Sequence, residues 1–141
     1  MLGGLYWGDN VVWQLDGARI ELFFRAIAGL SEVFETRTVV SLGSAVDAFD
    51  VPGLAVIDAG PDSDLAQPAD LLREIHRLCH PRGRRLLLFE SMDSMVRAWG
   101  ANSTRDFFAR CCLLLLEVGA IAYWSMSSRE TPSTVRETVE A

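Results

Sequence analysis

The stretch that decides the fold covers residues 84–126 and reads RRLLLFESMDSMVRAWGANSTRDFFARCCLLLLEVGAIAYWSM. An apolar run of strand length, residues 86–89, ends in small and acidic residues, and a long apolar segment, Gly119 and a second apolar run follow. This order predicts a β-α-β unit, because parallel strands that are buried on both faces need not alternate polar and apolar residues. Residues 90–94 then fall at the carboxyl end of the first strand, where open α/β sheets usually bind ligands.

Outward from this unit, strands and helices continue to alternate along the chain. The expected strands are residues 11–15, 36–42, 54–58, 86–89 and 120–126. The expected helices are residues 18–30, 69–79 and 92–99, a short turn at 45–49, and a long helix that is capped by Asn102 or Ser103 and ends at Val118. The long helix is apolar nearly all round, so we expect it to be largely covered.

This alternation predicts an α/β fold in a single three-layer domain, residues 1–128, with a mostly parallel sheet of five or more strands. Residues 129–141 turn polar and form a C-terminal tail or the start of a further helix. The chain of 141 residues is long enough for one domain with a sizeable core and too short for two of ordinary size.

Charge and composition limit the classes of function. The net charge of −6 argues against direct binding of nucleic acid, because such binding depends on clustered positive charge. All 13 positive residues are arginine, which excludes a P-loop lysine, a Schiff-base lysine and the lysine that a phospho-receiver needs. No signal peptide opens the chain, and no apolar run is long enough to cross a membrane. We therefore expect a cytoplasmic protein with no membrane partner.

The three cysteines are Cys79, Cys111 and Cys112. An odd number, with two of them adjacent on an expected helix, is not typical of a disulfide framework, so we interpret them as reduced, buried thiols. The alternative is a metal site in which Cys79 joins His76 and His80, which are four residues apart at the end of a helix.

Two acidic residues end expected strands, Asp58 and Glu90. If the strands are parallel, both lie at one edge of the sheet, where a pair of carboxylates could hold Mg²⁺ in an enzyme. The alternative is that each one caps the turn that follows it or faces solvent. Ser91, Asp93 and Ser94 are most simply caps of the helix after them.

The turn after the first expected strand, residues 14–19, reads QLDGAR. A loop that holds phosphates needs several glycines, whose backbone N–H groups can approach the anion, with a lysine and a serine or threonine after them. This turn has one glycine and an acid, and Arg19 is a poor substitute for the lysine because its planar fork is aimed differently. A working P-loop is excluded, and we expect no cofactor.

Residues 86–126 resemble the second half of a RecA/KaiC-type ATPase core. In that family a hydrophobic strand ends in an acid and a serine, and a short helix, a long helix, a glycine and another strand follow. Glu90 and Ser91 lie where the Walker B acid and serine fall, and residues 95–100 resemble the short helix. Residues 8–13 are similar to the strand that leads into the P-loop. Because the P-loop is missing and the Walker B acid is a glutamate, the resemblance implies a degenerate, non-hydrolysing member that binds other proteins.

Residues 54–62, LAVIDAGPD, are similar to the third strand and phospho-acceptor loop of a response-regulator receiver, and residues 38–49 resemble the segment before it. With Asp16 as the only acid after the first strand and with no lysine, this resemblance implies a pseudo-receiver that cannot transfer phosphate. The long segment between the fourth and fifth expected strands favours the RecA-like interpretation. Strand order separates the two: 2-1-3-4-5 in a receiver, and the P-loop strand between later strands in a RecA core.

Together these features predict a non-catalytic, P-loop-less RecA/KaiC-like module that acts through protein–protein contacts in regulation or assembly. The expected partner is another protein or a second copy of this chain, bound through apolar surface near the termini. The alternatives are a pseudo-receiver signalling domain and a Mg-dependent enzyme that uses Asp58 and Glu90.

Overall fold

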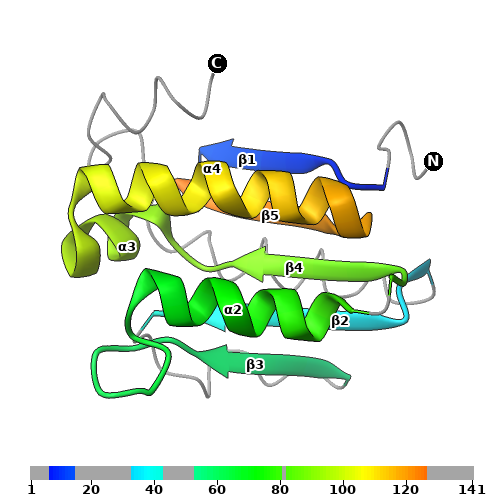
Figure 1. The fold of residues 1–141 in the computed structure, drawn as a ribbon, viewed down its shortest axis with the longest axis horizontal. Helices are drawn as coiled ribbons and strands as arrows, with labels where there is room; N and C mark the ends of the chain where they lie inside the picture. The colour runs from blue at the N-terminus through cyan, green and yellow to red at the C-terminus, as the bar shows by residue number, and fades with distance from the viewer. Residues whose placement is uncertain (1–6, 15–32, 43–52, 81, 127–141) are drawn as a thin grey trace.

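The computed structural model describes residues 7–14, 33–42, 53–80 and 82–126. Figure 1 shows a sheet with helices laid across one of its faces. The strands are β1 (Asn10–Gln14), β2 (Thr36–Ser41), β3 (Leu54–Asp58), β4 (Arg85–Phe89) and β5 (Ile121–Met126). The helices are α2 (Pro68–Cys79), α3 (Met92–Trp99) and α4 (Ala101–Val118).

Within the described residues the sheet has five strands in the order β1-β5-β4-β2-β3, and every neighbouring pair is parallel. The predicted α/β fold with a parallel sheet is therefore confirmed, and no expected strand bound differs from the observed one by more than one residue. The helix expected at residues 18–30, the turn at 45–49 and the tail from residue 129 lie outside the described residues.

The strand order bears on the two families that the sequence resembles. A receiver would place β1 between β2 and β3, but the observed β1 pairs with β5, and β2 pairs with β3 directly. The pseudo-receiver alternative is therefore wrong. The reason is that the chain crosses from β4 to β5 through two helices and returns toward β1, which a receiver does not do. Within the described residues β1 pairs with β5 alone, so a second neighbour for β1 is not described.

Both faces of the sheet are buried. In Figure 1, α2 and α4 lie side by side across one face, where Val40, Phe89 and Trp124 belong to the larger core cluster. On the opposite face, Val39 and Leu88 have no exposed surface and belong to a second cluster. The continuous apolar runs of the sequence are explained by this double burial, because alternate residues of one strand enter two different cores.

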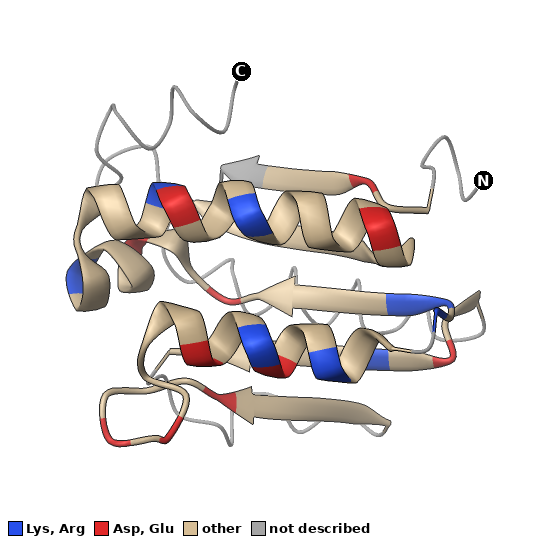
Figure 2. Ribbon diagram, viewed as in Figure 1, with Lys and Arg blue, Asp and Glu red and all other residues tan. Residues whose placement is uncertain are grey.

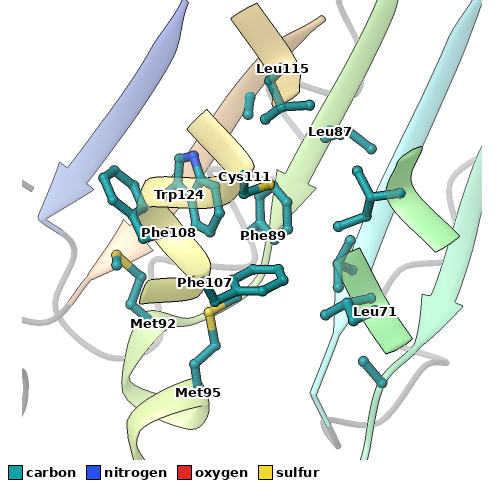
Figure 3. Close-up of a cluster of buried hydrophobic side chains, with 14 of the residues drawn as sticks. Leu71, Leu87, Phe89, Met92, Met95, Phe107, Phe108, Cys111, Leu115 and Trp124 are labelled. Atoms are coloured by element: carbon teal, nitrogen blue, oxygen red, sulfur yellow. The ribbon is translucent and has the colours of Figure 1, made fainter. Parts of the chain in front are cut away.

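The larger core is built around two stacked rings from neighbouring strands. Phe89 of β4 and Trp124 of β5 have ring centroids 3.7 Å apart and planes 6° from parallel. Phe107 and Phe108 of α4 meet Trp124 edge-on, at centroid distances of 6.2 and 4.9 Å. Figure 3 shows these rings between the sheet and the helices. The Trp124 indole N–H donates to Asn10 Oδ1 at 2.9 Å, which ties β5 to β1.

Helix α4 differs from its prediction in two ways. It begins at Ala101, directly after Gly100, so the expected caps Asn102 and Ser103 are wrong. Gly100 has a φ of +86°, a conformation that ends α3 and lets α4 begin at once. In the first turn of α4, the Thr104 hydroxyl donates to the Gly100 carbonyl at 2.8 Å.

The outward face of α4 is the second difference. The helix was expected to be largely covered, but Leu113 is 70% exposed and Leu116 is 62% exposed. A helix packed on a sheet buries one face only, and here that face carries Phe107, Cys111 and Leu115. The run of four leucines therefore continues round the helix onto a surface that the described residues do not cover.

The stacked rings allow a direct test of the core. Trp124→Ala removes a buried ring and its hydrogen bond, so we expect the free energy of unfolding to fall by about 3–5 kcal/mol. Urea denaturation followed by far-UV circular dichroism measures this. The control is Arg73→Ala, which changes a side chain that is 78% exposed and should shift stability by no more than about 0.5 kcal/mol. A loss below about 1 kcal/mol for Trp124→Ala would contradict the packing described here.

Candidate functional site

Polar side chains from four neighbouring strands fall at one level of the sheet, near the carboxyl ends. The register pairs Phe89 with Trp124, Val40 with Phe89, and Ser41 with Asp58. The residues that follow Trp124, Phe89 and Val40 are therefore level with one another and with Asp58. In the order β5, β4, β2 and β3 they are Ser125, Glu90, Ser41 and Asp58. We call these four residues the strand-end row. Because side chains alternate along a strand, the row lies on the face opposite to α2 and α4.

Glu90 is the centre of the strand-end row and connects three strands. It is only 5% exposed. Its backbone N–H donates to the Val40 carbonyl at 3.1 Å, and its carboxylate accepts the Leu42 N–H at 3.1 Å. On the other side, the Ser125 hydroxyl donates to the Glu90 carbonyl. The residue thus fixes the end of β4 to both β2 and β5.

The burial of Glu90 changes its acidity. Loss of water around the carboxylate raises its pKa above the ordinary value of 4.5, and the Leu42 N–H, the Ser41 hydroxyl and the positive charge of Arg97 counter this in part. The Ser41 hydroxyl is fully buried and makes no hydrogen bond of ordinary geometry with the part of the chain that is described. Its influence on Glu90 is therefore that of a nearby dipole rather than of a formed bond.

Asp58 is placed differently. It is exposed, and its Oδ1 accepts the N–H of Gly60 at 2.8 Å, so it closes the turn that follows β3. A carboxylate that bonds a backbone N–H two residues later stabilises a turn without any ligand. For Asp58 this confirms the alternative in which each strand-end acid caps the turn that follows it or faces solvent. For Glu90 that alternative is wrong, because its carboxylate is buried and bonds the Leu42 N–H instead.

The structure does not bring Asp58 and Glu90 side by side. Strand β2 lies between β3 and β4, so the two backbones are about 10 Å apart, twice the usual strand spacing. Across residues 7–14, 33–42, 53–80 and 82–126, no group of three or more histidine, cysteine or acidic side chains is arranged to hold a metal ion. A Mg²⁺ site that uses both carboxylates stays a prediction.

The sequence did not point to Ser41 and Ser125 as members of this site. Ser125 interrupts the largely apolar strand β5, Ser41 ends β2 directly after two valines, and both are almost completely buried. A buried hydroxyl at the end of an apolar run is the signal that could have identified them, because burying an unpaired hydroxyl costs free energy. Their position beside Glu90 depends on strand order, which the local sequence does not encode.

The segment after Glu90 has the predicted capping role. Ser91 Oγ accepts the N–H of Ser94 at 3.1 Å and precedes the first residue of α3. The acidic Asp93 lies in the first turn of α3 and is buried, where a negative charge is favoured by the partial positive charge of the helix start. Arg97, one turn later, donates to Ser94 Oγ at 3.1 Å.

The cysteines are free thiols, as predicted. Cys79 and Cys111 are fully buried, and burial raises the pKa of both thiols; it raises that of the half-buried Cys112 to about 11. Thiols held in the protonated form are poor nucleophiles and poor metal ligands. The predicted site that joins Cys79 to His76 and His80 is not assembled, because Cys79 lies in the core while both histidines are exposed.

A hollow of 290 Å³ lies elsewhere, between α2 and α4 on the helical face. Leu72 and Phe107 contribute apolar lining, and Asp106 and Arg110 contribute charge. It does not include any residue of the strand-end row. The turn at residues 15–19, where a P-loop would lie, is outside the described residues.

Comparison with known proteins places the fold. No protein-family model and no curated protein matches this chain. Among solved structures, a KaiC-like protein from the hyperthermophilic archaeon Pyrococcus horikoshii is similar with a TM-score of 0.71 and 17% sequence identity, over 97% of this chain and 71% of that one. The chain therefore has the fold of this KaiC-like structure, a single α/β domain, and its described strands form an all-parallel sheet of five. In the described part of the chain, no helix is long and apolar enough to cross a membrane.

The raised pKa of Glu90 predicts a pH-dependent stability difference. A carboxyl whose pKa is higher in the folded state contributes stability that is fully present below its unfolded pKa and is lost as the pH rises through the folded-state value. Glu90→Gln keeps an oxygen for the Leu42 N–H and removes the ionisation. The free energy of unfolding of the variant should therefore gain on that of the wild type as the pH rises above 4.5, the ordinary value.

Urea denaturation of both proteins from about pH 4 to about pH 8 measures this difference. The companion variant Glu90→Leu also removes the acceptor and should be about 1–3 kcal/mol less stable than Glu90→Gln at every pH, since the Leu42 N–H is left unpaired. If the free energy of unfolding of the wild type instead gains on that of Glu90→Gln as the pH rises, the carboxylate is stabilised, not penalised, in the folded protein.

Proposed function

We propose that this protein is a non-catalytic, P-loop-less module of KaiC-like fold that self-associates through the outward face of α4 and acts in regulation or assembly. The absence of lysine and the single glycine at residues 14–19 support the loss of ATP hydrolysis. The buried, bonded state of Glu90 also supports it, because that carboxylate is engaged by the Leu42 N–H. Reduced thiols in the core support a cytoplasmic location.

The observation that carries the proposal is the composition of α4's outward face. Leu113 and Leu116 are the large hydrophobic side chains that the described residues leave exposed. They lie between Arg110 and Glu117 on the helix, and both of these charged residues are exposed. In the described part of the chain, neither forms an ion pair or a hydrogen bond. We call these four residues the α4 patch.

Helix α2 provides an internal comparison, because it lies beside α4 and is equally charged (Figure 2). Its outward charges are paired within the helix: Arg73 with Asp70 at 2.7 Å, and Arg77 Nε with Glu74 at 2.9 Å. Charged pairs three residues apart stabilise a solvated helix surface. The α4 patch lacks such internal pairs, and this favours a partner that supplies the opposite charges.

A second copy of the chain supplies them. If two α4 helices meet antiparallel about a twofold axis near Leu113, Arg110 of each copy faces Glu117 of the other, since the two residues lie at equal distances on either side of the axis. Leu113 and Leu116 then fill the centre of the contact. Such a self-complementary arrangement is what a twofold interface requires. A helix of this length is only about 27 Å long, so we expect a weak, reversible dimer.

Association can be measured by analytical ultracentrifugation over a range of protein concentrations. Leu113→Asp with Leu116→Asp should leave the chain monomeric, because unpaired charges replace the apolar centre. Arg110→Glu and Glu117→Arg should each weaken the dimer, and the double charge swap should restore it, because it exchanges the two partners of each pair. The matched control Arg73→Glu on α2 should leave the dimer unchanged.

Two outcomes contradict self-association through the α4 patch. One is a wild-type chain that stays monomeric at the highest concentration tested. The other is a dimer that the aspartate substitutions leave intact. If the charge swap fails to restore a dimer that the single variants weaken, the antiparallel geometry is wrong even though the face is correct.

Nucleotide binding is tested by thermal unfolding with Mg-ATP and with Mg²⁺ alone. A ligand at one hundred times its dissociation constant stabilises a folded protein by about 2.7 kcal/mol, which raises Tm by several degrees for a domain of this size. We expect no change with Mg-ATP, because the chain has no phosphate-binding loop. A rise with Mg-ATP but not with Mg²⁺ would contradict the loss of the nucleotide site, and a rise with Mg²⁺ alone would support the predicted site at Asp58 and Glu90.

A further inference from the structure

The chain contains two histidines, and the structure brings them together at the end of α2. His76 and His80 are both exposed, and their Nε2 atoms are 3.0 Å apart. The ring centroids are 4.3 Å apart and the ring planes are tilted by 56°. The four-residue spacing puts both rings on one side of the helix. The two Nε2 atoms are therefore close enough for one ion to contact both.

This separation matches two ligands of one metal ion. A transition metal binds imidazole nitrogen at about 2.0–2.1 Å, so two such bonds at a right angle span about 3 Å. We propose that His76 and His80 form a two-histidine site for a divalent transition-metal ion, and that water fills the other positions. The right angle suits octahedral Ni²⁺ and tetragonal Cu²⁺ better than tetrahedral Zn²⁺.

The surroundings of the pair agree with a bound cation. Helix α2 ends at Cys79, and the carboxyl end of a helix carries a partial negative charge that favours a cation. The adjacent positive side chain, Arg77, is already paired with Glu74. Cys79 takes no part, because its thiol is buried in the core. Both imidazoles are accessible, so an ion can reach them without any rearrangement of the fold.

The competing interpretation is a simple hydrogen bond, in which one neutral ring donates its Nε2–H to the bare Nε2 of the other. The same distance of 3.0 Å satisfies it. A metal ion replaces that shared proton and binds both nitrogens at once. The two interpretations differ in one measurable respect: the metal site binds an ion saturably, and the simple hydrogen bond does not.

The site is separate from the surfaces assigned above. Figure 1 shows that α2 runs antiparallel to the strands, so His76 and His80 lie toward the edge where the strands begin, away from the strand-end row. They are also on a different helix from the α4 patch. Loss of metal binding therefore leaves self-association unchanged, and a monomeric α4 variant should still bind metal.

Isothermal titration of the untagged, full-length chain with NiCl₂, CuCl₂ and ZnCl₂ tests the site. We expect one ion per chain, with affinity in the order Cu²⁺, Ni²⁺, Zn²⁺, and a rise in Tm with Ni²⁺. His76→Asn and His80→Asn should each weaken Ni²⁺ binding by at least about tenfold, because one ligand of two is lost. Both residues are exposed, so both variants should keep the wild-type circular dichroism spectrum.

Cys112→Ser is the control, because Cys112 is the least buried of the three thiols. It should leave Ni²⁺ binding unchanged. The proposal is overturned if neither Ni²⁺ nor Cu²⁺ binds saturably, if binding is unaffected by either histidine substitution, or if Cys112→Ser abolishes it.

Discussion

The strand-end row depends on Glu90, a single residue at the end of β4 that is hydrogen-bonded to the ends of both neighbouring strands, β2 and β5. Its N–H is bonded to Val40 of β2, its carboxylate to Leu42 directly after β2, and its carbonyl to the Ser125 hydroxyl of β5. A buried carboxylate costs free energy unless it is bonded, and burial raises the pKa of this one. Removing one partner of such a network lowers the free energy of unfolding by more than the bond's net contribution, because a buried polar group is left unpaired.

The register that Glu90 fixes also aligns the core. With Phe89 opposite Trp124, the two rings stack, and Phe107 and Phe108 of α4 close over them. The same alignment decides which face of α4 is buried and leaves Leu113 and Leu116 on the outside. The exposed leucines follow from the packing of the rings, because a helix turned to bury them would remove Phe107 from the core.

Much of this fold could be predicted from the sequence, and the reason is local. Continuous apolar runs between glycines and acids indicate buried parallel strands, and the bounds of β3 and α3 were predicted to the residue. Strand order was not predictable in this way, since it depends on long crossovers. For that reason Ser41 was not expected between Asp58 and Glu90. The start of α4 was placed too late, because the sequence did not show that Gly100, which ends α3, also directly precedes α4.

The same distinction applies to the site residues. Sequence spacing was sufficient to place His76 and His80 on one side of a helix, but not to show that Cys79 between them faces the core. In each case the sequence predicted which residues are near one another along the chain, and packing decided which of them are accessible. In this KaiC-like fold the strand-end acid Glu90 forms a structural hydrogen bond with the Leu42 N–H. The protein's accessible chemistry then lies on the outer faces of α2 and α4, where no strand order constrains the residues.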